Sequence, residues 1–110
     1  MSAVFIVRDA DGVLHVAGEL QRGNADGLGS ELLAAAHAAM PPLIVDLFEL
    51  ELDDATAVVA GVEALRALTA LGPVTVRHAP HWLAHSLYRI NALGQDAITL
   101  EAPREEEPYG

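Results

Sequence analysis

The sequence predicts an α/β fold: a single-layer, mixed but mostly parallel β-sheet with helices packed on it, opening with a β-hairpin. Two short apolar runs near the N-terminus flank an Asp-Gly turn signal, which indicates an antiparallel pair. Short apolar runs then alternate with helical stretches, as in chains that build a parallel sheet. With 110 residues, we expect one domain over residues 1–101 and an acidic, disordered tail over 102–110.

The hairpin strands are predicted over Ala3 to Arg8 and Val13 to Ala17. Gly18 to Gly23 is expected to be a loop. Asn24 or Asp26 can then cap a helix that runs to about Met40, where Pro41-Pro42 ends it. The core positions of this helix, at helical spacing, are Leu28, Leu32, Ala35 and Ala39.

The stretch from Leu43 to Leu71 is predicted to form a buried strand, a short loop and a long helix. Leu43 to Leu47 is apolar on both faces, as expected for a central strand covered by helices. Asp54 is a good N-cap, because its carboxylate can accept bonds from the first free N–H groups. The expected core stripe is Val58, Val62, Leu65 and Leu68, and the exposed face is Thr56, Val59, Ala60, Glu63, Arg66, Ala67 and Ala70.

Three further elements are expected. Val74 to Arg77 is a strand, and Pro80 suits the first turn of a third helix. The inner stripe of that helix is Leu83, Leu87 and Ile90, and Trp82 beside it is expected to cover the edge of the core. Asp96 to Leu100 is the last strand.

Composition and charge exclude several function classes. The net charge is −10, with six Arg and no Lys, so no basic patch is available for nucleic acid. No apolar run approaches the ~20 residues of a membrane span, and we expect no direct membrane contact. Met1 to Val7 lacks the pattern of a signal peptide. Since the chain has no Cys, it has no disulfide framework, and we expect a cytoplasmic location.

Histidines are the strongest candidates for metal ligands. His81 and His85 are four residues apart on the predicted third helix, and His78 is near them. No carboxylate is close in sequence, and the Glu of a metalloprotease helix is missing, so we interpret them as a polar helix face and expect no metal. His15 and His37 are interpreted as structural. We find neither a catalytic constellation nor a glycine-rich phosphate loop, and expect no enzyme and no cofactor.

Several motifs occur together in order along the chain. Gly18-Glu19-Leu20 ends a strand, Leu43 to Leu47 reads Leu-Ile-Val-Asp-Leu, and Asp54-Ala55-Thr56-Ala57 follows a loop. With the third helix over Leu83 to Gly94, the chain from Val13 to Leu100 resembles a STAS domain, the family of bacterial anti-sigma factor antagonists and their relatives. In that family the loop ends in Asp-Ser-Ser-Gly. Here Ala55 replaces the first Ser, Ala57 replaces Gly, and Gln21 replaces a common acidic residue.

The resemblance implies a regulatory function. Thr56 matches the Ser or Thr that a partner kinase phosphorylates, supported by Asp54 and Ala55 as helix cap and phosphosite neighbour. The unmodified protein would dock an anti-sigma factor, a serine/threonine kinase of the histidine-kinase-like ATPase type, and phosphorylation would release it. The implied partner-binding face is Asp53, Ala57, Val59, Ala60, Glu63, Arg66, Ala67, Glu19, Gln21 and Arg22.

Other interpretations stay open. A Thr near a helix start is most often only part of the capping. Some small STAS proteins are accessory subunits of ABC-type lipid transporters, and hold the transporter ATPase through the same helix face. In that alternative Thr56 is a contact and not a phosphosite. A nucleotide-binding STAS relative is disfavoured by the missing phosphate loop.

Overall fold

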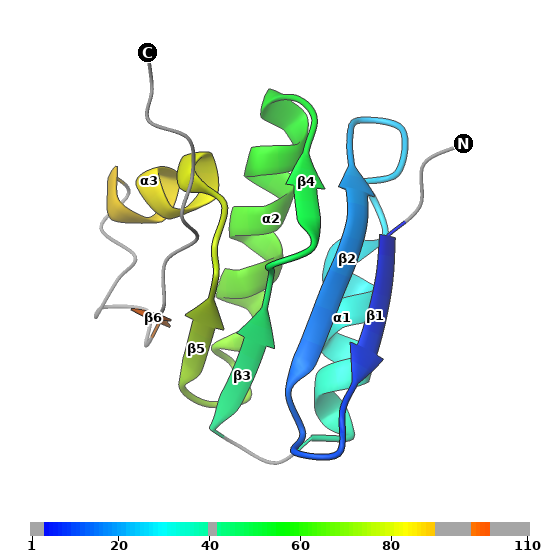
Figure 1. Cartoon of the computed structure of the whole chain (residues 1–110), viewed down its shortest axis with the longest axis vertical. Helices are drawn as coiled ribbons and strands as arrows, with labels where there is room; N and C mark the ends of the chain where they lie inside the picture. The colour runs from blue at the N-terminus through cyan, green and yellow to red at the C-terminus, as the bar shows by residue number, and fades with distance from the viewer. Residues whose placement is uncertain (1–3, 40–41, 90–97, 102–110) are drawn as a thin grey trace.

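The computed structural model describes residues 4–39, 42–89 and 98–101. Strands and helices follow one another along the chain (Figure 1). Their bounds are β1 Val4–Arg8, β2 Leu14–Leu20, α1 Leu28–His37, β3 Leu43–Asp46, β4 Leu50–Leu52, α2 Ala55–Leu68, β5 Val74–Arg77, α3 His81–Arg89 and β6 Ile98–Glu101.

One sheet contains all of these strands, in the order β1-β2-β3-β5-β6, and β4 pairs with the end of β2. β1 and β2 form an antiparallel hairpin, whereas every other pairing between the described strands is parallel. The prediction of an α/β fold with a mixed, mostly parallel sheet and an opening hairpin is therefore confirmed.

The helices lie on one side of the sheet, and the other side faces solvent (Figure 1). Alternate residues of the central strands are buried beneath the helices: Leu14, Val45 and Val76 are each 0% exposed. The residues between them are only partly buried, as Ile44 and Asp46 of β3 show. The prediction that this central strand is covered on both faces is therefore wrong, because no described helix packs on its second face. We call this second side the open face.

The predicted loop over Gly18 to Gly23 is also partly wrong. β2 continues to Leu20, since Gly18, Glu19 and Leu20 pair with Leu50, Glu51 and Leu52 of β4. The short loop predicted between Leu47 and the α2 helix therefore contains a strand, β4. The end of β2 and the short β4 are both extended because each supplies hydrogen-bond partners for the backbone of the other.

α1 begins later than predicted. Asn24 does not cap it; instead its side chain accepts a bond from the Gln21 N–H (2.8 Å) and donates to the Glu19 carbonyl (2.8 Å). Gly27 occupies the N-cap position without a side-chain bond, and the helix ends at His37 rather than near Met40. Its buried residues are Leu28, Leu32 and Ala36, while Ala35 and Ala39 pack partly buried against the core.

In α3 the predicted inner residues Leu83 and Leu87 are both 0% exposed. The expected extension of this helix through Ile90 to Gly94, the first part of the last strand and the acidic tail over 102–110 lie outside the described residues.

Candidate docking site around Thr56

Asp54 joins the start of α2 to the loop between β2 and α1. It has extended backbone dihedrals at the N-cap, and its Oδ1 accepts a bond from the Ala57 N–H at 2.9 Å, as predicted. Its Oδ2 accepts a second bond, from the Arg22 N–H at 3.0 Å. The Arg22 bond, followed by the Ala57 bond, lowers the pKa of Asp54, because both N–H groups stabilise the charged carboxylate.

Further bonds fix the same junction. The Asp53 N–H donates to the Leu20 carbonyl at 2.9 Å, which attaches the end of β4 to the end of β2. The Asn24 side chain adds two more bonds, to the Gln21 N–H and the Glu19 carbonyl, in the loop next to the first turn of α2. The loop is therefore positioned by hydrogen bonds before any partner arrives.

Thr56 is the second residue of α2 and is half-buried. It lines one end of a groove of about 330 Å³ between α1 and α2, whose other lining residues are Ala25, Asp26, Gly29, Ser30, Val59, Ala60, Glu63 and Ala64. The prediction that Thr56 is exposed is therefore wrong in degree: Thr56 is half-buried, because α1 forms the opposite wall of the groove. The first N–H groups of a helix have no intrahelical acceptor, so the dipole at this end favours an added anion.

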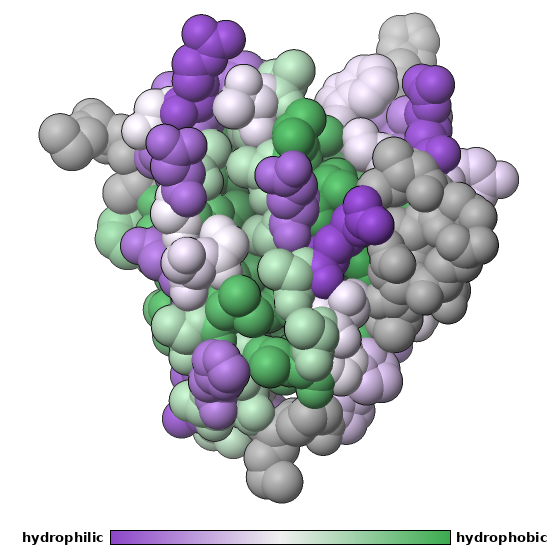
Figure 2. Space-filling model, turned by 180° about the vertical axis from the view of Figure 1, so that it is seen from behind, coloured by the Kyte–Doolittle hydropathy of each residue, from purple (hydrophilic) through white to green (hydrophobic). Residues whose placement is uncertain are grey.

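Val59 and Trp82 are the large apolar residues of the neighbouring surface. They are 56% and 61% exposed, and both line a second groove, of about 540 Å³, between α2 and α3. Figure 2 shows this helix side, where apolar surface lies between projecting polar side chains. The prediction that Trp82 covers the edge of the core is therefore wrong. It directly precedes the buried Leu83, and a step of 100° along the helix moves it onto the surface.

The structure brings together only part of the predicted partner-binding face. Thr56, Val59, Ala60 and Glu63 share the first groove. Asp53 and Ala55 line the second groove, with Val59 common to both. Glu63 also borders a separate hollow further along α2, lined by Arg66, Ala67 and Thr69.

The other four residues of the predicted face line none of these three hollows. Ala57 is 0% exposed, so its assignment to the partner-binding face is wrong: its side chain points into the core. Glu19 alternates with the buried Leu20 and therefore points to the open face, away from the helices. Gln21 is half-buried, whereas Arg22 is exposed beside Asp54.

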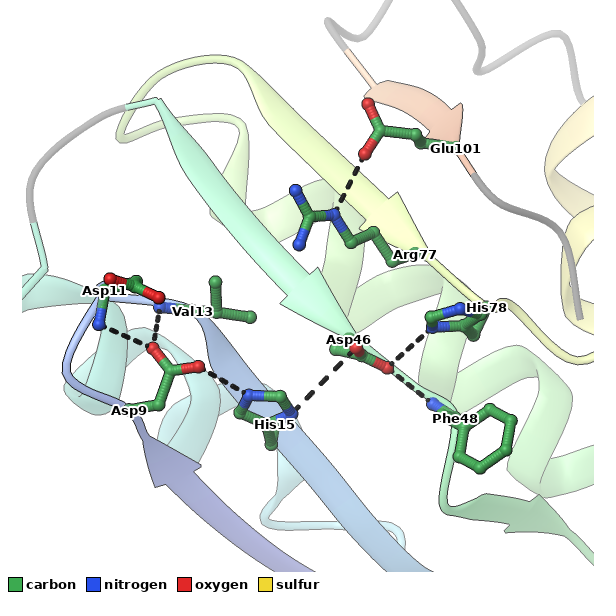
Figure 3. A network of polar contacts seen from close by, with 9 residues as sticks. All are labelled: Asp9, Asp11, Val13, His15, Asp46, Phe48, Arg77, His78 and Glu101. Atoms are coloured by element: carbon green, nitrogen blue, oxygen red, sulfur yellow. Dashed lines mark hydrogen bonds and ion pairs between the residues drawn. The ribbon is translucent and has the colours of Figure 1, made fainter.

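A polar network crosses the open face (Figure 3). The Asp46 carboxylate accepts a bond from the Phe48 N–H at 2.8 Å and contacts His78 Nδ1 at 3.1 Å and His15 Nδ1 at 4.0 Å. His15 Nε2 in turn contacts Asp9 at 2.9 Å, and Arg77 pairs with Glu101 at 2.9 Å. His78 is therefore a partner of Asp46 and not part of a cluster on α3, where His81 and His85 stack with ring centroids 5.8 Å apart.

Within residues 4–39, 42–89 and 98–101, no three His, Asp or Glu side chains are arranged to hold a metal ion. The same residues include no helix that is both long and apolar enough to cross a membrane. Comparison with protein-family models and with curated proteins finds no match for the chain.

Proposed function

We propose that this chain is a STAS-type regulatory binding module that docks a kinase-like anti-sigma factor through the helix face around Thr56, and that phosphorylation of Thr56 releases it. The observation that supports the proposal most directly is the position of Thr56. It lies in the first turn of a capped helix, at one end of a groove and one helical turn from the exposed Val59.

Electrostatics support a switch at this position. A phosphate on Thr56 would carry about two negative charges and would lie at the positive end of α2, two residues from Asp54, whose carboxylate accepts a bond from the Arg22 N–H. The surrounding surface is already acidic, with Asp26, Asp53 and Glu63 lining the two grooves. A partner that packs on Val59 would have to desolvate the added charge, which opposes docking.

The test uses purified candidate kinases, with ATP and Mg²⁺, and intact-mass spectrometry followed by peptide mapping. Addition of one phosphate to wild type, and none to Thr56→Val, is the expected result, because valine keeps the shape and removes the hydroxyl. Phosphate elsewhere, or equal phosphorylation of both proteins, would contradict the proposal.

Docking is then measured by calorimetry with the same kinase. Thr56→Glu should bind at least tenfold more weakly than wild type, because it adds a charge to the contact surface. Thr99→Glu is the matched control: Thr99 is exposed on β6 and pairs with Thr75 on the open face, so the same substitution leaves the helix face unchanged. Equal affinity of Thr56→Glu and wild type would refute the phospho-switch.

The half-burial of Thr56 in the groove also supports the alternative of a transporter ATPase that uses Thr56 as a contact. In that case Thr56→Val should weaken binding of the ATPase, and no phosphate should appear on the wild-type protein.

A further inference from the structure

β1 forms an outer edge of the sheet. It pairs with β2 on one side, and within the described part of the chain no strand pairs with its other side (Figure 1). Its sequence is Val-Phe-Ile-Val-Arg, without the Lys or Pro that commonly protect edge strands from pairing with another chain. The Arg8 guanidinium donates to the Ala38 carbonyl, so its charge lies against the end of α1.

The direction of the β1 backbone groups follows from one bond of the hairpin. The Asp9 N–H donates to the Val13 carbonyl at 3.0 Å, which makes Asp9 a residue whose backbone groups point to β2. In an antiparallel pair this direction alternates along the strand. Phe5 and Val7 therefore also direct their N–H and C=O groups to β2, while Val4, Ile6 and Arg8 direct theirs outward, to the unpaired edge.

The side chains of β1 alternate in the same way between the two sides of the sheet. Val4 and Ile6 pack partly buried against the core. Phe5 and Val7 are on the open face, where they are 62% and 60% exposed. A strand with an aromatic and a β-branched residue exposed in this spacing is complementary to an antiparallel copy of itself, because each Phe5 can lie opposite a Val7.

We propose that a second copy of this chain pairs with β1 in antiparallel orientation, around a two-fold axis that passes beside Ile6. Ile6 of one copy then lies opposite Ile6 of the other, and Val4 of each copy lies opposite Arg8 of the other. Each of these three opposed pairs can exchange two backbone hydrogen bonds, which gives about six between the copies. Phe5 lies opposite Val7 on the open face. Such a pairing is closed by its own symmetry, and joins the two sheets into one. It does not depend on the function proposed for the Thr56 face.

The first test is the mass in solution, measured by sedimentation equilibrium at increasing concentration. The mass should rise from 11.6 kDa toward twice that value. Phe5→Lys should weaken the association at least tenfold, since it places a charge opposite Val7. Phe48→Lys is the matched control, because Phe48 is 61% exposed and borders the same open face beside His15 and His78, away from the edge.

Two results would overturn the proposal. One is a monomer at every concentration up to about 1 mM, where even a weak complex would form. The other is equal loss of association in Phe5→Lys and Phe48→Lys, which would indicate that the open faces stack instead of the edges pairing.

A second test fixes the register, and uses the absence of natural cysteines. Phe5→Cys and Val7→Cys proteins are mixed, oxidised and mapped by mass spectrometry. In the proposed register positions 5 and 7 face each other with Cα atoms about 4.5 Å apart, which suits a disulfide. Two copies of position 5, or of position 7, would be about 8 Å apart, too far for one.

The expected product is therefore a disulfide between positions 5 and 7 in the mixture, whereas each variant alone should form almost no disulfide-linked dimer. Equal cross-linking in all three samples, or none in the mixture, would refute the two-fold register.

Discussion

The contact between Gly61 of α2 and Leu83 of α3 allows a quantitative test of how α3 is held. A Cβ on Gly61 would lie 3.2 Å from Leu83 Cδ1 and 3.8 Å from Cδ2, and Leu83 is 0% exposed. Gly61→Ala gains about 1 kcal/mol of helix propensity. It also pushes a leucine methyl group by a few tenths of an ångström, at a cost of about 1 kcal/mol. We expect little net change in the free energy of unfolding.

The result should differ when Leu83 is shortened. Leu83→Ala removes buried methyl groups and should cost about 3 kcal/mol, including the cavity that remains. In that background the alanine at position 61 meets no leucine methyl groups and fills part of the cavity. Gly61→Ala should then stabilise by about 1 kcal/mol, which gives a coupling of similar size between the two sites.

The free energies come from urea unfolding followed by circular dichroism, with wild type, both single variants and the double variant. Gly29→Ala is the control, because a Cβ at that position of α1 has no heavy atom within 4 Å. It should have the same effect with and without Leu83→Ala. If Gly61→Ala also stabilises equally in both backgrounds, Gly61 and Leu83 are not in close contact, and the packing of α3 on α2 is refuted.

Three other variants test the polar junctions and the docking surface. Burial alone would raise the pKa of Asp46, but bonds from the Phe48 N–H and His78 outweigh it and lower the pKa below its usual 3.8. The ionised carboxylate therefore stabilises the fold above pH 3.8, and this contribution is lost as the pH falls through the lowered pKa. Asp46→Asn should cost about 1 kcal/mol at pH 7, and urea unfolding should show the difference vanishing in acid. Asp54→Ala should speed hydrogen exchange of the Arg22 and Ala57 amides, its two donors, without changing exchange in β5. Trp82→Ser should weaken docking of the proposed partner while leaving the unfolding midpoint unchanged, since Trp82 is mostly exposed.

Two local signals of the sequence, the Asp54 cap and the Asp11-Gly12 turn, predicted local structure correctly. Asp54 caps α2 because a capping bond spans only three residues, and the hairpin forms where Asp11-Gly12 favours a turn. Gly12 has φ 88°, a conformation that glycine adopts without strain. These features depend on neighbours in the chain, so they can be inferred without knowing the tertiary contacts.

The buried side of α2 was predicted less well, because size was taken as the guide. Val58 was expected in the core and is only partly buried, whereas Ala57, Gly61 and Ala64 are buried. Small residues permit close approach of α1, α3 and the sheet, and that approach decides which side of the helix is covered. The apolar Ile44 led to a wrong prediction for a similar reason. An apolar residue on each side of a strand does not reveal whether helices cover one face of the sheet or both.

Ala55 and Ala57, two positions at which the chain differs from the STAS motif, differ in their exposure to a docking protein. The Ala57 methyl group is buried and cannot contact a docking protein, whereas Ala55 is exposed and lines the groove beside Trp82. Under the proposed function, Ala57→Gly, which introduces the glycine of the STAS motif, should cost about 1 kcal/mol of stability through helix propensity and leave phosphorylation of Thr56 and docking unchanged. Ala55→Ser should alter the affinity for the proposed kinase partner and leave stability almost unchanged. Calorimetric affinities and urea unfolding of both variants test this separation. Loss of docking in folded Ala57→Gly would show that the backbone at this position, and not the surface of α2, controls access to Thr56.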